Sequence, residues 1–325
     1  MTRRGLAGAA LASLLAGCAA SPPLKDGLPE SAPPAIELAE TPFFPQEDFQ
    51  CGPAALATLL VASGVDVNPD ALVPEVYLPG RAGSLSLELV GATRRHGRLP
   101  WVLDTTADEM VEELEAGRPV LLLQNRGVPQ IPIWHYAVLV GYDAERNLAI
   151  LRSGDTERLE MKWQRFARAW HQGGRFAMTV LKPGEIPAHA GPARFIEAAA
   201  GLEAAGQRQS ARAAYESAIS RWPGEPHAWL GLGNVALADG DRAAAADAYL
   251  RAILLAPDHA AARNNLAELL LDAGCLDESR RQVERASALA EGTSLAPAIA
   301  DSRARIRATA EAVSNCQLGD RTWPD

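Results

Sequence analysis

The chain has 325 residues, a length typical of about two domains. Hydrophobic residues make up 48% of it and charged residues 22%, which is enough apolar material for a sizeable core and excludes a wholly disordered protein. The net charge of −9, without a cluster of basic residues, argues against nucleic-acid binding, and four cysteines are too few for a disulfide-stapled scaffold.

The first twenty residues have the features of a secretory signal. Two arginines precede the apolar run Leu6–Leu15, which is too short to span a membrane as a helix. The run ends in Leu-Ala-Gly-Cys, which resembles the lipobox of bacterial lipoproteins. The resemblance implies cleavage before Cys18 and lipid attachment to its sulfur. The alternative is a chance cysteine inside an ordinary signal peptide.

The expected mature protein would begin with a tether. Residue 19 is alanine rather than aspartate, which by analogy with those lipoproteins favours the outer membrane, with the protein facing the periplasm. The following residues are rich in proline, alanine and serine, as in flexible linkers. We therefore expect a signal peptide at 1–17 and a tether at 18–40, and no later apolar run is long enough for a membrane span.

Residues 41–183 mix apolar runs of β-strand type with helical patterns. Helices lead and strands dominate later, so we predict an α+β domain with an antiparallel sheet. The predicted helices are Gly52–Ser63, Leu85–His96, Thr106–Ala116 and Met161–Trp170. The predicted strands are Leu99–Leu103, Pro119–Gln124, His135–Tyr142, Leu148–Leu151 and Phe176–Leu181.

Cys51 is the candidate nucleophile of this domain. It precedes Gly-Pro and an apolar run, and Pro53 suits the first turn of a helix. A cysteine at a helix N-terminus has its thiolate stabilised by the helix dipole, so we expect a lowered pKa. Many cysteines before a helix are nevertheless buried and inert, so the assignment depends on what surrounds Cys51.

Three further features complete a nucleophilic site. Gln46 lies just upstream, where its amide and the backbone N–H of Cys51 would form an oxyanion hole. His135 opens an apolar strand and is the expected general base. The next strand ends in polar residues, where a group that orients the imidazole should lie: we expect Asp155, with Ser153 as the alternative acceptor.

These segments resemble a known family. QEDFQCGPAALATLL, GSLSLELVGATRRHG and HYAVLVGYDAERNLAILRSGD are similar to segments of the papain-like peptidase C39 family. The resemblance implies a papain-like domain in which Cys51 is the nucleophile, Gln46 shapes the oxyanion hole and His135 is the base. The family usually has an Asp-Pro pair where this sequence has Ser153-Gly154, and the loss of an orienting aspartate lowers the rate of catalysis.

After a proline- and glycine-rich linker at 184–192, alanine becomes frequent and a 34-residue period appears. Phe195, Trp229 and Arg263 are equivalent, as are Tyr215, Tyr249 and Val283 at a later position. The pattern resembles the tetratricopeptide repeat, which implies an all-α solenoid of three units at 193–292 and a protein partner for its groove. The alternative is an alanine-rich helical bundle without repeats.

The last segment, 293–325, is expected to hold a capping helix, Ala298–Val313, and a tail. Cys275 falls in a repeat turn and Cys316 in the tail, and the sequence leaves open whether they form a disulfide in an oxidising compartment. No histidine has the spacing of a metal ligand and no nucleotide-binding motif is present, so we expect no metal and no other cofactor.

The sequence therefore predicts a periplasm-facing lipoprotein with a C39-like cysteine peptidase domain, acting on a peptide or protein, and a repeat array that recruits substrate or partner. The alternative is a non-catalytic adaptor whose papain-like domain only binds peptide. Transfer to another acceptor, or amide hydrolysis in cell-wall peptide, is a third reading.

Overall fold

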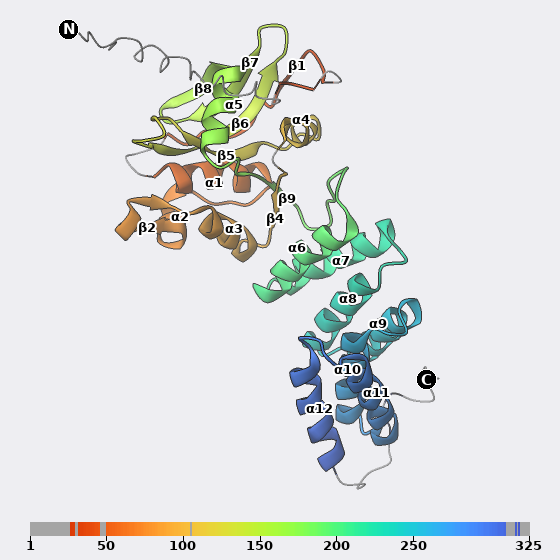
Figure 1. The fold of residues 1–325 in the computed structure, drawn as a ribbon. Helices are drawn as coiled ribbons and strands as arrows, with labels where there is room; N and C mark the ends of the chain where they lie inside the picture. Colours follow the sequence, from red (N-terminus) through yellow and green to blue (C-terminus); the bar gives the residue numbers. More distant parts are fainter. Residues whose placement is uncertain are drawn as a thin grey trace, which may run out of the picture.

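The computed structural model describes residues 27–29, 32–45, 50–104, 106–309, 316 and 318, which form an α/β domain and a helical array (Figure 1). Cys18, Gln46 and most of the predicted tail lie outside these residues. Within the described residues, no helix is both long enough and apolar enough to cross a membrane.

The α/β domain is built on one antiparallel sheet. The strand order is β4-β9-β5-β6-β7-β8, and β1 pairs with the end of β6 that lies far from His135. A separate two-stranded sheet pairs β2 with β3. The strands are β1 (Ala35–Glu37), β2 (Tyr77–Leu78), β3 (Gly83–Ser84), β4 (Leu99–Val102), β5 (Val120–Asn125), β6 (Trp134–Asp143), β7 (Leu148–Ser153), β8 (Thr156–Lys162) and β9 (Ala177–Leu181).

Helices cover both faces of this sheet because its central strands are apolar on both sides. Along β6, Val138 and Val140 pack with α1, whereas Ala137 and Leu139 belong to the core on the other face. A strand that is buried on both faces has a nearly continuous apolar sequence, and β6 has such a sequence. The helices are α1 (Cys51–Ala62), α2 (Pro69–Val76), α3 (Ser86–Arg95), α4 (Ala107–Glu115) and α5 (Trp163–Gln172), with a short 3-10 helix η1 (Pro79–Arg81).

All five predicted strands and all four predicted helices of this domain form, with shifted ends. The predicted helix from Met161 is corrected at its start: Met161 lies in β8 and α5 begins at Trp163. The sequence Thr-Glu-Arg-Leu-Glu-Met-Lys has weak strand propensity, but its backbone pairs with β7 over most of its length. Neither β8 nor α2 was predicted.

The helical half consists of three antiparallel helix pairs followed by α12 (Figure 1). Small residues let neighbouring helices approach, as the repeat pattern predicts: the Tyr215 ring packs on Gly231 and the Tyr249 ring on Gly233. The structure bonds Cys275 to Cys316. The helices are α6 (Pro192–Ala204), α7 (Arg208–Arg221), α8 (Pro226–Ala238), α9 (Arg242–Leu255), α10 (Ala260–Asp272), α11 (Leu276–Leu289) and α12 (Ala296–Ala308).

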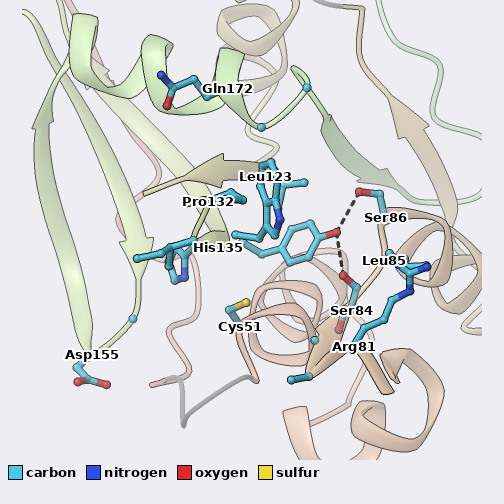
Figure 2. A pocket seen from close by; sticks show the side chains of 18 residues that line it. Cys51, Arg81, Ser84, Leu85, Ser86, Leu123, Pro132, His135, Asp155 and Gln172 are labelled. Atoms are coloured by element: carbon cyan, nitrogen blue, oxygen red, sulfur yellow. Dashed lines mark hydrogen bonds between the residues drawn. The ribbon is translucent and has the colours of Figure 1, made fainter. Parts of the chain in front are cut away.

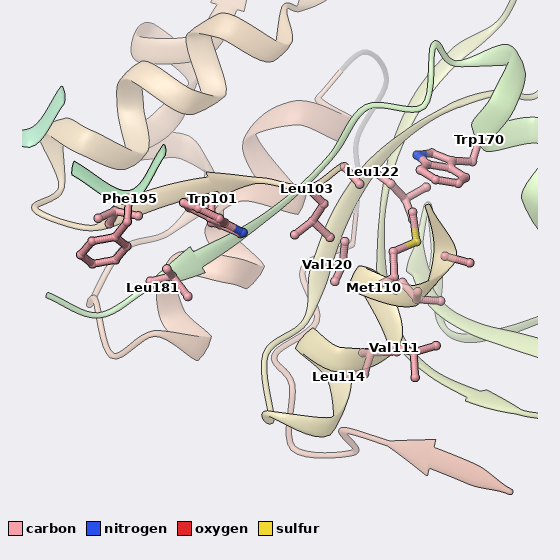
Figure 3. Packing of buried hydrophobic residues seen from close by; sticks show 14 of the residues in the cluster. Trp101, Leu103, Met110, Val111, Leu114, Val120, Leu122, Trp170, Leu181 and Phe195 are labelled. Carbon is pink, nitrogen blue, oxygen red and sulfur yellow. The ribbon is translucent and has the colours of Figure 1, made fainter. Parts of the chain in front are cut away.

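The first helix pair of the array docks on the α/β domain. Phe195 of α6 is fully buried, and its ring centroid lies 6.5 Å from that of Trp101 on β4 (Figure 3). On its other side, the ring centroid lies 5.8 Å from that of Trp222. The Arg194 guanidinium lies over Trp101, 4.3 Å from the ring centroid. One hydrophobic core thus continues from the sheet into the first repeat unit, across the predicted linker.

Candidate active site

Cys51 is the first residue of α1, where the sequence places it. Pro53 occupies the first turn, and Gly52 allows Ser84 of β3 to pack directly against the helix. Burial raises the pKa of the Cys51 thiol, and the backbone N–H groups of Tyr136, Gly52 and Cys51 itself oppose this only in part. The expected lowering of the pKa is therefore wrong for the substrate-free site, because desolvation of the charged thiolate outweighs the helix terminus.

His135, near the start of β6, is 8% exposed. Its Nε2 atom lies 2.8 Å from the Ser153 Oγ atom, so Nδ1 is the nitrogen left for a proton from Cys51. Burial first, and the nearby charge of Arg126 second, lower the pKa of His135 to about 4. The imidazole is therefore neutral at pH 7, which is the form that can act as a base.

Of the two acceptors expected for His135, the structure places Ser153 against the ring. Ser153 is buried at the end of β7, on the strand next to β6. Asp155 is exposed, and its carboxylate points away from His135 (Figure 2). The reason is the turn: Ser153 pairs with Thr156, so Asp155 lies in the two-residue connection, past the end of the strand face.

Cys51 and His135 line one cavity of about 1060 Å³ (Figure 2). The contact between the Cys51 sulfur and the Tyr136 backbone brings the sulfur beside β6, one residue from His135. The remaining walls come from the η1–β3 segment, the approach to β6, the β7–β8 turn and the end of α5. They are residues 81–86, Leu123, Pro132, Ile133, Trp134, Tyr136, Gly154, Asp155, Gln172, Gly173 and Gly174.

Tyr136 is a site residue that the sequence did not single out. Its hydroxyl lies 3.0 Å from Ser86 Oγ and donates a longer hydrogen bond, 3.5 Å, to the Ser84 carbonyl. Burial raises the pKa of Tyr136 to about 12, so the phenol stays protonated and holds the β3 segment beside Cys51. In the sequence, the only indication of a role for Tyr136 was that it directly follows the candidate base, His135, on an apolar strand.

The remaining expectations concern the oxyanion hole and metals. The backbone N–H of Cys51 is present at the helix start, but the predicted second donor, Gln46, lies outside the described residues. Among the described residues, no group of three or more histidine, cysteine, aspartate or glutamate side chains could hold a metal ion.

Comparison with protein families gives two matches. Residues 38–178 match the Peptidase_C39 like family, and residues 197–254 and 232–294 match the tetratricopeptide repeat. The protein therefore has a C39-like domain followed by tetratricopeptide repeats. No curated protein matches it.

Solved structures resemble each half separately. A Bacillus anthracis protein assigned provisionally as a C39-like peptidase is 20% identical, with a TM-score of 0.39, over 46% of this chain and 98% of that one. The Yersinia enterocolitica type III secretion chaperone SycD, in complex with a peptide of the translocator YopD, is 18% identical, with a TM-score of 0.33, over 35% of this chain and 91% of that one.

Proposed function

We propose that this protein, which joins a C39-like domain to tetratricopeptide repeats, is a cysteine peptidase that hydrolyses peptide bonds with Cys51 and His135. One observation carries the proposal: a cysteine at a helix start and a histidine whose far nitrogen is bonded to Ser153 line the same cavity. That is the arrangement of a nucleophile, a base and a group that orients the base.

The substrate-free site holds a thiol and a neutral imidazole, so the proton moves only when a carbonyl is in place. As the Cys51 sulfur attacks, Nδ1 of His135 takes the thiol proton, and the Cys51 backbone N–H, with Gln46 as the proposed second donor, stabilises the oxyanion. The amide C–N bond then breaks as His135 gives that proton to the leaving amine. Water hydrolyses the thioester and regenerates the thiol.

Ser153 limits this mechanism and supports the adaptor as the second candidate. A carboxylate would accept the Nε2–H and stabilise the imidazolium, whereas a hydroxyl can also donate to Nε2 and favour the wrong tautomer. In the adaptor, the cavity around Cys51 binds peptide without cleaving it. Turnover separates the two candidates.

We propose that lipid on Cys18 anchors the protein to the outer membrane, facing the periplasm, with the array recruiting substrate or a protein partner. The lipobox resemblance supports the anchor, and tetratricopeptide repeats generally mediate protein–protein interaction. A Cys18→Ser variant should leave the membrane fraction. If it stays at the wild-type level, Cys18 is not the anchor.

The peptidase proposal is tested with a peptide that carries a thiol-directed electrophile. We expect labelling of Cys51 in the wild type, none in Cys51→Ala and slow labelling in His135→Ala, together with cleavage of a quenched fluorescent peptide pool by the wild type alone. Glu88→Gln, a change on α3 that leaves the cavity lining intact, serves as the control. Equal labelling of the wild type and His135→Ala, with no cleavage, would favour the adaptor.

A further inference from the structure

Two opposite charges lie at the two ends of the cavity around Cys51. Arg81 ends η1 on the side of Ser84 and Leu85, and Asp155 lies in the β7–β8 turn beyond His135 (Figure 2). Both side chains are exposed. Neither has a hydrogen bond or an ion pair with any residue that the structure describes, so both charges are available to a ligand.

Several other charged groups of this domain pair with neighbours. Arg158 pairs with Glu37 and Glu160, and Arg95 pairs with Glu75. These pairs lie away from the cavity lining. Arg81 and Asp155 thus differ from them both in position and in lacking a partner among the described residues.

Apolar side chains form the wall between the two charges. Leu85, Ile133 and Trp134 line the cavity although they are 37%, 59% and 56% exposed. Exposed apolar groups that gather at a cavity mark a surface for an apolar part of a ligand. A ligand that covers them would reach toward Arg81 at one end and Asp155 at the other.

The proposed chemistry gives this ligand a direction. His135 must protonate the leaving amine, so the substrate residues that follow the scissile bond lie on the His135 side of the sulfur, toward Asp155. The acyl part, which precedes the bond, lies on the other side, along Ser84 and Leu85 toward Arg81. The direction therefore depends on the peptidase proposal, whereas the two charged ends do not.

We infer that the site selects an extended peptide with acidic side chains N-terminal to the scissile bond, an apolar centre and basic side chains C-terminal to it. An exposed ion pair changes affinity by up to about fivefold, so the two together give up to about 25-fold. Salt should reduce the preference, because exposed charges are screened.

The test compares two fluorescent peptides of the same composition. One reads Asp-Asp-Ala-Leu-Ala-Ala-Lys-Lys and the other carries the lysines first and the aspartates last. Their binding to the full-length Cys51→Ala variant is measured by fluorescence anisotropy at low and high salt, and their cleavage is measured with the wild type. Each end of the peptide carries two like charges, so that a shift of the bound peptide by one residue along the cavity still leaves a charge at each end.

The matched variants are Arg81→Glu/Asp155→Lys, which exchanges the two charges, and Arg165→Gln, which removes an exposed charge of α5 outside the cavity lining. We expect 5- to 25-fold tighter binding of the acid-first peptide, reversal in the double variant and an unchanged preference in Arg165→Gln. Equal binding of both peptides, no binding of either, or a preference that survives the charge exchange would overturn the inference.

The two proposals fail differently. Selective binding to Cys51→Ala without cleavage by the wild type would support the charged ends and favour the adaptor. Cleavage of both peptides at equal rates would support the peptidase and overturn the charge selection.

Discussion

Phe195→Ala should destabilise the C39-like domain although Phe195 belongs to the helical array. The ring is fully buried between Trp101 of β4 and Trp222 of the first repeat unit. Truncating a buried phenylalanine to alanine costs about 3–5 kcal/mol through lost burial and the cavity left behind. Because the core is continuous across the linker, we expect this loss on both sides of it.

The assay follows each half of the molecule during urea unfolding. In a Cys18→Ser background, Cys51 is the thiol left unbonded by the disulfide, so the rise of its reaction rate with a thiol reagent above the rate in the native protein reports unfolding of the C39-like domain. Far-UV circular dichroism reports mainly the helices. For a slope of about 2–3 kcal/mol per M, Phe195→Ala should lower the midpoint of Cys51 exposure by about 1–2 M urea.

Ile253→Ala is the matched control. Ile253 is buried in α9, in a separate core of the array, and its truncation costs a comparable amount, about 2–5 kcal/mol. It should shift the helical signal and leave Cys51 exposure nearly unchanged, since repeat units are coupled mainly to their neighbours. If Phe195→Ala also leaves Cys51 exposure unchanged, the two halves unfold independently and the argument from a shared core is refuted.

Three further predictions concern the site. Ser153→Ala should lower kcat about three- to tenfold, which is the effect of losing one neutral hydrogen bond, and Ser153→Asp should raise kcat above the wild-type value. If Ser153→Asp is slower than Ser153→Ala, residue 153 does not orient His135. Since the Cys51 pKa is raised and that of His135 lies near 4, iodoacetamide should alkylate Cys51 more slowly than free cysteine at pH 7. The alkylation rate should increase as the pH rises toward the thiol pKa. A rate that is constant between pH 5 and 7 would instead indicate a preformed ion pair of Cys51 and His135. Gly52→Ala would place a Cβ 2.6 Å from Ser84 Cβ and so displace β3, and kcat/KM should fall about 10- to 100-fold; unchanged kinetics would show that β3 does not need its present position.

The sequence was most informative about the two proposed reacting residues, because the local pattern around each of them indicates one kind of secondary structure. An apolar run after Cys-Gly-Pro predicts α1 and puts Cys51 at its start, and a histidine on an apolar strand predicts the place of His135. Both assignments needed only periodicity and residue chemistry. The 34-residue period likewise predicted the repeat helices, because each unit repeats the same packing of small residues against aromatic ones.

The sequence was less informative where three-dimensional context decides. Ser153 and Asp155 are two residues apart, and only the tight turn at Gly154, with φ of 60°, takes Asp155 off the strand face. The pKa of Cys51 depends on how deeply the thiol is buried, which no spacing reports. The packing of the first repeat unit against the sheet could not be predicted either, because a linker rich in proline and glycine is typical of a flexible domain boundary.

The docking of α6 on β4 also bears on aggregation. An unpaired strand edge can recruit strands from other molecules, and the strand order of this sheet ends at β4 and at β8. At β8, Arg158 and Glu160 put charges on the edge, whereas β4, Leu-Pro-Trp-Val, is apolar and packs against α6. Arg194 of α6 donates a hydrogen bond to the Val102 carbonyl at the end of β4. During synthesis β4 can pair only once β9 has been made. Since β9 ends at Leu181 and α6 begins at Pro192, the interval in which this apolar edge is open to other molecules is short.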